Sequence, residues 1–204
     1  MKYRAVGTRC AVIIQDLKLP ISDREALRIL KQNGFRVIEV DLIALARNCV
    51  GQSIYNRGAR PSEAPAIVDC SSFTKYLYGQ RGIWLPRRSI QQREYGEIVS
   101  ISDIVGGELV FVSGWINYYY NHPSDGVGHV GIATDQKTVV HAADKTTGIV
   151  ESPIDKFVEK NRLRGIRRYI PLDRKVITLE TPPRREVEIT DDLRWIILQS
   201  FSPK

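Results

Sequence analysis

Cysteine is scarce in this sequence: its 204 residues include three, at positions 10, 49 and 70. An odd, small number argues against a disulfide framework. Close ligand pairs such as Cys-x-x-Cys or His-x-x-x-His are absent. One cysteine and two histidines from distant parts of the chain would suit zinc chemically, but without such a pair we predict no metal ion.

Long apolar runs are also missing, so we predict no membrane span. The apolar segment 11–14 is too short for the core of a signal peptide, and Asp16 and Lys18 close it. We therefore expect a cytoplasmic protein, or one exported by a route that this sequence does not encode. The net charge of +7 and the pI near 9.4 favour an acidic partner such as nucleic acid, anionic lipid or a carboxylate-rich polymer. No helix-turn-helix or RNA-binding motif is visible, so we predict no nucleic-acid partner.

Helical patterns come first along the chain and strand patterns follow. Ser22 and Glu25 form a capping box before an amphipathic segment that stops at Gly34. A second helix is predicted over 41–53. Strands rich in β-branched residues are predicted over 108–112, 128–134, 138–143, 148–151 and 164–170. Few helices interrupt these strands, which predicts an α+β fold with an antiparallel sheet of about five strands.

The segment 69–78 predicts a helix that begins with a cysteine. Phe73, Tyr76 and Leu77 fall at helical spacing, and Asp69 is a suitable N-cap. Cys70 then lies in the first turn, where the helix dipole favours an anion and the thiol ionises more readily. A buried structural cysteine is an equal alternative on this segment alone.

A cysteine nucleophile needs a base, and His129 and His141 lie on neighbouring predicted strands. Because side chains alternate along a strand, the two rings share a face only if the connecting loop is odd in length. We predict that Ala133 pairs with Lys137, which sets His129 directly opposite His141. The pair would then be a base and its orienting partner, or simply two histidines bonded to their neighbours. His122 lies in a polar loop and is not predicted to be catalytic.

Taken together, the motifs resemble the NlpC-type cell-wall cysteine endopeptidases, a papain-like family. The resemblance covers about residues 41–171. It rests on the following ordered segments: Tyr55-x-x-Gly58, Asp69-Cys70-Ser71-x-Phe73, Leu85-Pro86-Arg87 with Ser89 and Gln92, Gly107 to Phe111, His129 to Ile132 and Val140 to Ala142.

The resemblance implies a fold in which the nucleophile helix packs on the sheet. It implies that Cys70 is the nucleophile, His129 the general base and His141 the orienting residue. The implied reaction cleaves peptidoglycan stem peptides between D-glutamate and a diamino acid, through a thioester and without a cofactor. The partner would be a stem peptide or muropeptide. We assign substrate binding to Tyr55, Asp69, Ser71, Arg87 and Trp115, although a solvated surface pair with Arg88 is the default interpretation of Arg87.

Three residues depart from the family pattern. Ser72 and Ala59 replace glycines, which is expected to narrow or reshape the cleft, and Glu108 replaces an aspartate. The loop 113–128 is long and aromatic. It is either a lid or wall that stacks on substrate, or a surface loop whose aromatic rings pack on the body.

We predict three parts: an N-terminal extension over 1–40, a catalytic domain over 41–172 and a C-terminal extension over 173–204. Two alternatives remain open. The same catalytic residues would serve a deamidase, transamidase or acyltransferase, because a thioester passes its acyl group to amine or water alike. A basic binding module without activity would instead keep Cys70 and His129 apart.

Overall fold

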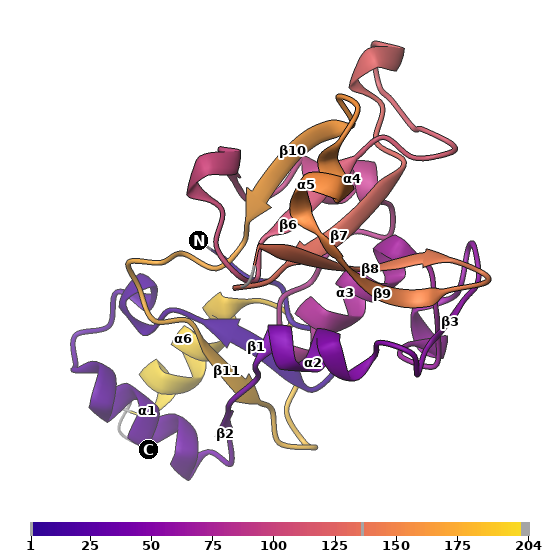
Figure 1. Cartoon of the computed structure of the whole chain (residues 1–204). Coiled ribbons are helices and arrows are strands. Elements are labelled where there is room, and N and C mark those ends of the chain that lie inside the picture. Colours follow the sequence, from indigo (N-terminus) through magenta and orange to yellow (C-terminus); the bar gives the residue numbers. More distant parts are fainter. Residues whose placement is uncertain (1, 136, 201–204) are drawn as a thin grey trace. The chain divides into compact units, whose positions relative to one another are not determined.

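The computed structural model describes residues 2–135 and 137–200, and the chain divides into two compact units (Figure 1). The first unit comprises Met1–Val40, Tyr78–Trp84 and Ile170–Lys204; the second comprises Asp41–Leu77 and Leu85–Tyr169. The two end segments that the sequence suggested as extensions therefore fall in one unit.

The first unit is built on a three-stranded antiparallel sheet in the order β1-β11-β2. Its strands are β1 (Arg9–Val12), β2 (Arg36–Ile38) and β11 (Ile177–Glu180), and its helices are α1 (Asp23–Gln32), α6 (Thr190–Gln199) and the 3-10 turn Ile14–Leu17. The capping prediction for α1 is confirmed, because the Ser22 side chain accepts a hydrogen bond from the Glu25 backbone N–H. The strand β11 lies between two strands from the other end of the chain and was not predicted.

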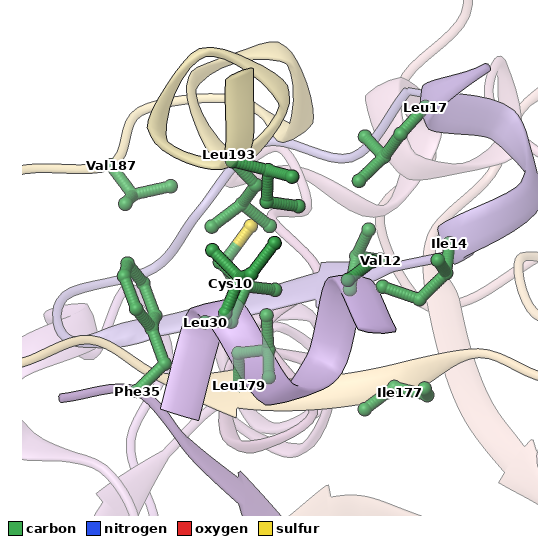
Figure 2. Close-up of a cluster of buried hydrophobic side chains, with 13 residues drawn as sticks. Cys10, Val12, Ile14, Leu17, Leu30, Phe35, Ile177, Leu179, Val187 and Leu193 are labelled. Atoms are coloured by element: carbon green, nitrogen blue, oxygen red, sulfur yellow. The ribbon is translucent and has the colours of Figure 1, made fainter. Parts of the chain in front are cut away.

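A hydrophobic cluster fills the space between this sheet and its helices. Figure 2 shows Cys10 of β1, Leu30 of α1 and Leu193 of α6 converging, with Leu179 of β11 beside them. All four are at most 1% exposed. Burial raises the pKa of the Cys10 thiol to about 12, so this cysteine is a core residue rather than a nucleophile.

The second unit contains a six-stranded antiparallel sheet in the order β5-β10-β6-β7-β8-β9. The strands are β5 (Glu97–Val99), β6 (Leu109–Val112), β7 (His129–Ala133), β8 (Thr138–Asp144), β9 (Gly148–Pro153) and β10 (Leu163–Arg168). Five of them coincide with the predicted strands to within a few residues. The edge strand β5 was missed, because three residues are too few to show alternation.

The remaining elements of this unit surround the sheet. They are α2 (Leu42–Asn48), the parallel pair β3 (Ile54–Tyr55) and β4 (Ile67–Val68), α3 (Cys70–Gln80, which ends in the first unit), α4 (Ser89–Arg93), α5 (Ile154–Val158) and 3-10 turns at Pro61–Glu63, Ile101–Asp103 and Pro123–Asp125. The helix α2 ends five residues before the predicted limit. Within residues 2–135 and 137–200, no helix has the length and apolar character needed to cross a bilayer.

Candidate active site

The start of α3 is fixed by Asp69, which follows β4 directly. Its Oδ1 accepts a hydrogen bond from the Ser72 backbone N–H at 2.8 Å, and its Oδ2 accepts one from the Gly58 backbone N–H at 3.0 Å. The helix therefore begins at Cys70, as predicted, with one terminal N–H satisfied by the cap.

Arg87 binds the capping residue Asp69 and fixes its position. Its guanidinium binds both carboxylate oxygens of Asp69, at 3.1 and 2.6 Å, and also donates to the Ser71 hydroxyl at 2.9 Å and the Ala59 carbonyl at 2.6 Å. The default interpretation of Arg87 as a solvated surface charge is therefore wrong. Burial raises the pKa of Asp69, but the Arg87 guanidinium and the Ser72 N–H outweigh it and hold the pKa below its usual value.

The two histidines meet on one face of the sheet, as predicted. His129 Nε2 lies 2.9 Å from His141 Nδ1, and the rings cross edge to face at 85°. The predicted pairing is wrong in register: Ala133 lies opposite Val139, not Lys137. Gln136, part of the predicted turn, lies outside the described residues.

This register sets Gly131 opposite His141, so the two histidines are diagonal neighbours. A Cβ on Gly131 would lie 2.9 Å from the His141 Cβ and 2.3 Å from Val139 Cγ1. The glycine therefore leaves the space beside the base of the His141 side chain. Diagonal neighbours in a sheet are within reach of large side chains, which accounts for the short contact between the rings.

One cavity of 910 Å³ joins these groups. All eight residues predicted for the site line it: Cys70, His129, His141, Tyr55, Asp69, Ser71, Arg87 and Trp115. The backbone N–H groups of Ser71 and Val130, the residue after His129, are close enough to the Cys70 sulfur to lower its pKa. The start of α3 therefore lies near β7. The catalytic and binding roles of the eight residues stay predictions.

Burial keeps the catalytic candidates neutral. It raises the pKa of the Cys70 thiol to about 12, with the Asp69 carboxylate acting in the same direction. It lowers the pKa of His129 to about 3 and that of His141 to about 4, with smaller effects from the neighbouring imidazole and from Arg162. The expected lowering of the Cys70 pKa at a helix N-terminus is therefore wrong, because desolvation outweighs the backbone N–H groups.

Comparison with known proteins identifies a family whose matched region includes the residues of this cavity. A model of the NlpC/P60 family matches residues 53–168, a segment that contains all eight predicted site residues. The chain belongs to the NlpC/P60 family. Its α+β fold, with an antiparallel sheet, is that of the family.

Curated relatives cover the same region. The chain is 33% identical to a probable endopeptidase of Corynebacterium glutamicum over 114 residues, which is 56% of this chain and 47% of that protein. It is 29% identical to a gamma-DL-glutamyl hydrolase of Bacillus subtilis over 145 residues, 71% of this chain and 32% of that protein. The chain thus spans half or less of the length of these NlpC/P60 relatives.

Solved structures show the same fold. An NlpC/P60 family protein from Bacillus cereus is 24% identical, with a TM-score of 0.51 over 64% of this chain and 40% of that chain. The Resuscitation Promoting Factor Interacting protein RipA is 16% identical, with a TM-score of 0.51 over 83% of this chain and 72% of that chain.

The three residues that depart from the family pattern, Ser72, Ala59 and Glu108, each make local hydrogen bonds. The Ser72 hydroxyl accepts from the Asp69 backbone N–H at 2.8 Å and is 3.2 Å from the Asp69 carbonyl, so this side chain is used in the helix cap rather than in narrowing the cleft. Ala59 presents its carbonyl to Arg87. Glu108 is 2% exposed and its carboxylate accepts from Arg168 Nε at 2.6 Å.

The aromatic loop forms an ordered wall of the NlpC/P60 cavity. Tyr118 and Val127 exchange backbone hydrogen bonds of 3.0 and 2.9 Å across its base, and Arg93 binds the Asp125 carboxylate and carbonyl at 2.8 Å. Trp115 is 99% exposed at the cavity wall, so its ring is available to a bound substrate. These contacts favour a fixed wall over a mobile lid.

Two residues at the histidine pair were missed by sequence reasoning. Ser152 Oγ lies 3.1 Å from His141 Nε2, and the Phe157 ring packs 4.7 Å from the His141 ring and 5.5 Å from the His129 ring. The predicted strand 148–151 stopped one residue short of Ser152. A longer strand would have placed this serine on the same sheet face as the histidines.

In the part of the chain that the structure describes, no three His, Cys, Asp or Glu side chains are grouped to hold a metal ion. His122, which the sequence suggested is not catalytic, binds the Ser124 hydroxyl through Nδ1 at 2.6 Å.

Proposed function

We propose that this protein is a cysteine endopeptidase that hydrolyses peptidoglycan stem peptides between D-glutamate and the following diamino acid. The observation that carries the proposal is the shared cavity, which is lined both by Cys70, at the start of α3, and by the hydrogen-bonded pair of His129 and His141. The relatives, a probable endopeptidase and a gamma-DL-glutamyl hydrolase, support a hydrolase of glutamyl peptides.

The reaction begins with attack of the Cys70 sulfur on the scissile carbonyl carbon, while the thiol proton moves to Nδ1 of His129. Nδ1 is the nitrogen available for this step, because Nε2 faces His141. The oxyanion forms at the N-terminus of α3, where backbone N–H groups favour negative charge. Collapse of this tetrahedral intermediate breaks the C–N bond, and His129 passes its proton to the leaving amine. Water then hydrolyses the thioester and regenerates the thiol.

The charges around the cavity support an acidic substrate. Five basic residues line it, against two acidic ones: Arg57, Arg87, Arg88, Lys145 and Arg162, against Asp69 and Asp144. The Arg87–Asp69 pair neutralises itself. The remaining excess is positive, and a stem peptide carries several carboxylates that it would attract.

The test is mass spectrometry of a synthetic tetrapeptide, L-Ala–γ-D-Glu–diaminopimelate–D-Ala, incubated with the protein in ¹⁸O-labelled water. We expect L-Ala–D-Glu with ¹⁸O in the new carboxylate. Cys70→Ala and His129→Ala should abolish cleavage, whereas His122→Ala should retain it. Cleavage at another bond would refute the proposed specificity. Transfer of the acyl group to an added amine in place of hydrolysis would favour the transamidase alternative.

A further inference from the structure

Three polar side chains form a straight diagonal across one face of the sheet. The β8–β9 register sets Ser152 opposite Val139, two residues before His141. The β7–β8 register, continued by three pairs, sets His129 opposite Ala143, two residues beyond His141 on the other side. His129, His141 and Ser152 therefore follow one line over β7, β8 and β9, with contacts of 2.9 and 3.1 Å.

This line has two possible proton arrangements. Both rings are neutral, so each carries one proton on one of its two nitrogens. In the first arrangement His129 Nε2–H donates to His141 Nδ1, and His141 Nε2–H donates to the Ser152 hydroxyl. In the second both hydrogen bonds are reversed: Ser152 donates to His141 Nε2, and His141 Nδ1–H donates to His129 Nε2.

The two arrangements differ at His129 Nδ1, the ring nitrogen that is not bonded to His141. In the first, His129 Nδ1 holds a lone pair and can accept the Cys70 proton. In the second, His129 Nδ1 already carries its proton and cannot act as a base. An imidazole, unlike a carboxylate, serves equally as donor or acceptor, so His141 alone does not choose between them. A serine hydroxyl at the far end of the line also donates or accepts, so the choice depends on where its own O–H finds a partner.

We propose that Ser152 is a positioning residue: its hydroxyl accepts the His141 Nε2–H and thereby holds His129 in the tautomer whose Nδ1 is free to act as the base. The side chain of Ser152 is half-buried, so water can accept from its O–H while one of its lone pairs accepts the His141 Nε2–H. The Phe157 ring packs on both imidazoles and holds their planes. The charged groups that act on His141 are Arg162, which disfavours its cation, and Asp144, which favours it.

The direct test is imidazole ¹⁵N NMR of the full chain, in which three histidines give a small set of signals. We expect both His129 and His141 to be protonated at Nε2 in the native protein. In Ser152→Ala a measurable fraction of His129 should carry its proton at Nδ1, and Ser152→Thr, which keeps the hydroxyl, should restore the native pattern. A native His129 protonated at Nδ1 would overturn the proposal, as would a tautomer pattern unchanged in Ser152→Ala.

Kinetics provide the second readout, and this part rests on the proposed function. Ser152→Ala should lower kcat by about fivefold to tenfold, the effect of one ordinary hydrogen bond, with KM unchanged. Ser152→Asp, which only accepts, should retain activity. Ser102→Ala, on an exposed turn of the same unit, is the matched control. A raised KM with unchanged kcat would overturn the positioning role.

The two proposals fail in different ways. Alkylation of Cys70 by iodoacetamide needs the same base but no peptide substrate, and it should slow in Ser152→Ala. If stem peptides survive while the tautomers and the alkylation rate respond to Ser152 as expected, the proposed substrate is wrong and the positioning role stands.

Discussion

The buried histidine pair should make the second unit sensitive to mild acid. The pKa of His129 is lowered to about 3 and that of His141 to about 4, whereas an unfolded histidine titrates near 6.5. Between pH 6.5 and pH 4 the unfolded chain therefore binds more protons than the folded one. The free energy of unfolding must fall as the pH falls through this window.

The size of the effect follows from the width of the window. One pKa unit corresponds to about 1.4 kcal/mol, so lowering the pH from 7 to 4.5 should cost about 2–3 kcal/mol per histidine, or about 5 kcal/mol for the pair. Carboxylates with lowered pKa values, such as Asp69, lose their contribution only at lower pH. The histidines should therefore dominate the change above pH 4.5.

Urea unfolding followed by pulsed hydrogen exchange of peptides from β7 and β8 measures this unit by itself. The double variant His129→Gln/His141→Gln should lose far less stability between pH 7 and 4.5 than the native protein. His122→Gln, at an exposed position, should behave as the native protein does. An equal loss in the double variant and the native protein would refute the assignment of acid sensitivity to the buried pair.

Three further predictions concern the same cavity. Because burial raises the pKa of the Cys70 thiol to about 12, its alkylation rate without substrate should still be rising above pH 9; a plateau below pH 8 would show a thiolate at rest. Arg87→Lys should destabilise the fold by about 2 kcal/mol in urea unfolding, since a lysine cannot replace the paired hydrogen bonds, whereas Arg88→Lys should be nearly neutral; equal effects would contradict the role of the Arg87 cap. Gly131→Ala should cost about 1–3 kcal/mol and reduce peptide cleavage, because the new methyl group would displace the base of His141; a variant with full activity would show that the strands yield there.

The sequence carried enough information to place both histidines on one face but not to pair them. Alternation of side chains along a strand specifies which face of the sheet a residue occupies. Several strand registers, each two residues apart, place both histidines on the same face, so alternation does not select one of them. The choice of Ala133 opposite Val139 depends on space, because Gly131 is the residue that tolerates a large neighbour directly opposite. That fit is a property of two strands together and is not visible in either strand alone.

Charge states were the least predictable part of the site. The position of Cys70 in the first turn of a helix is local information and was predicted correctly. Its pKa depends on how much water the rest of the fold removes, and here desolvation reverses the direction expected from the helix terminus. Likewise Arg87 is one of two adjacent arginines in the sequence, and only the tertiary structure sets it against Asp69 while Arg88 stacks on the Tyr118 ring at 5.4 Å.

A neutral thiol beside a neutral imidazole has a consequence for specificity. In the proposed mechanism, burial makes the free Cys70 thiolate unfavourable, so the nucleophile forms when a bound carbonyl can accept its electrons. Water or a misplaced amide gains little from such a site, because the proton must move from Cys70 to His129 as the new bond forms. Substrate contacts along the cavity wall, including Trp115, then contribute to the rate as well as to binding. For this reason Trp115→Ala should lower kcat for a stem peptide while leaving the substrate-free alkylation rate of Cys70 unchanged, and a change in KM alone would show that the wall serves only to bind.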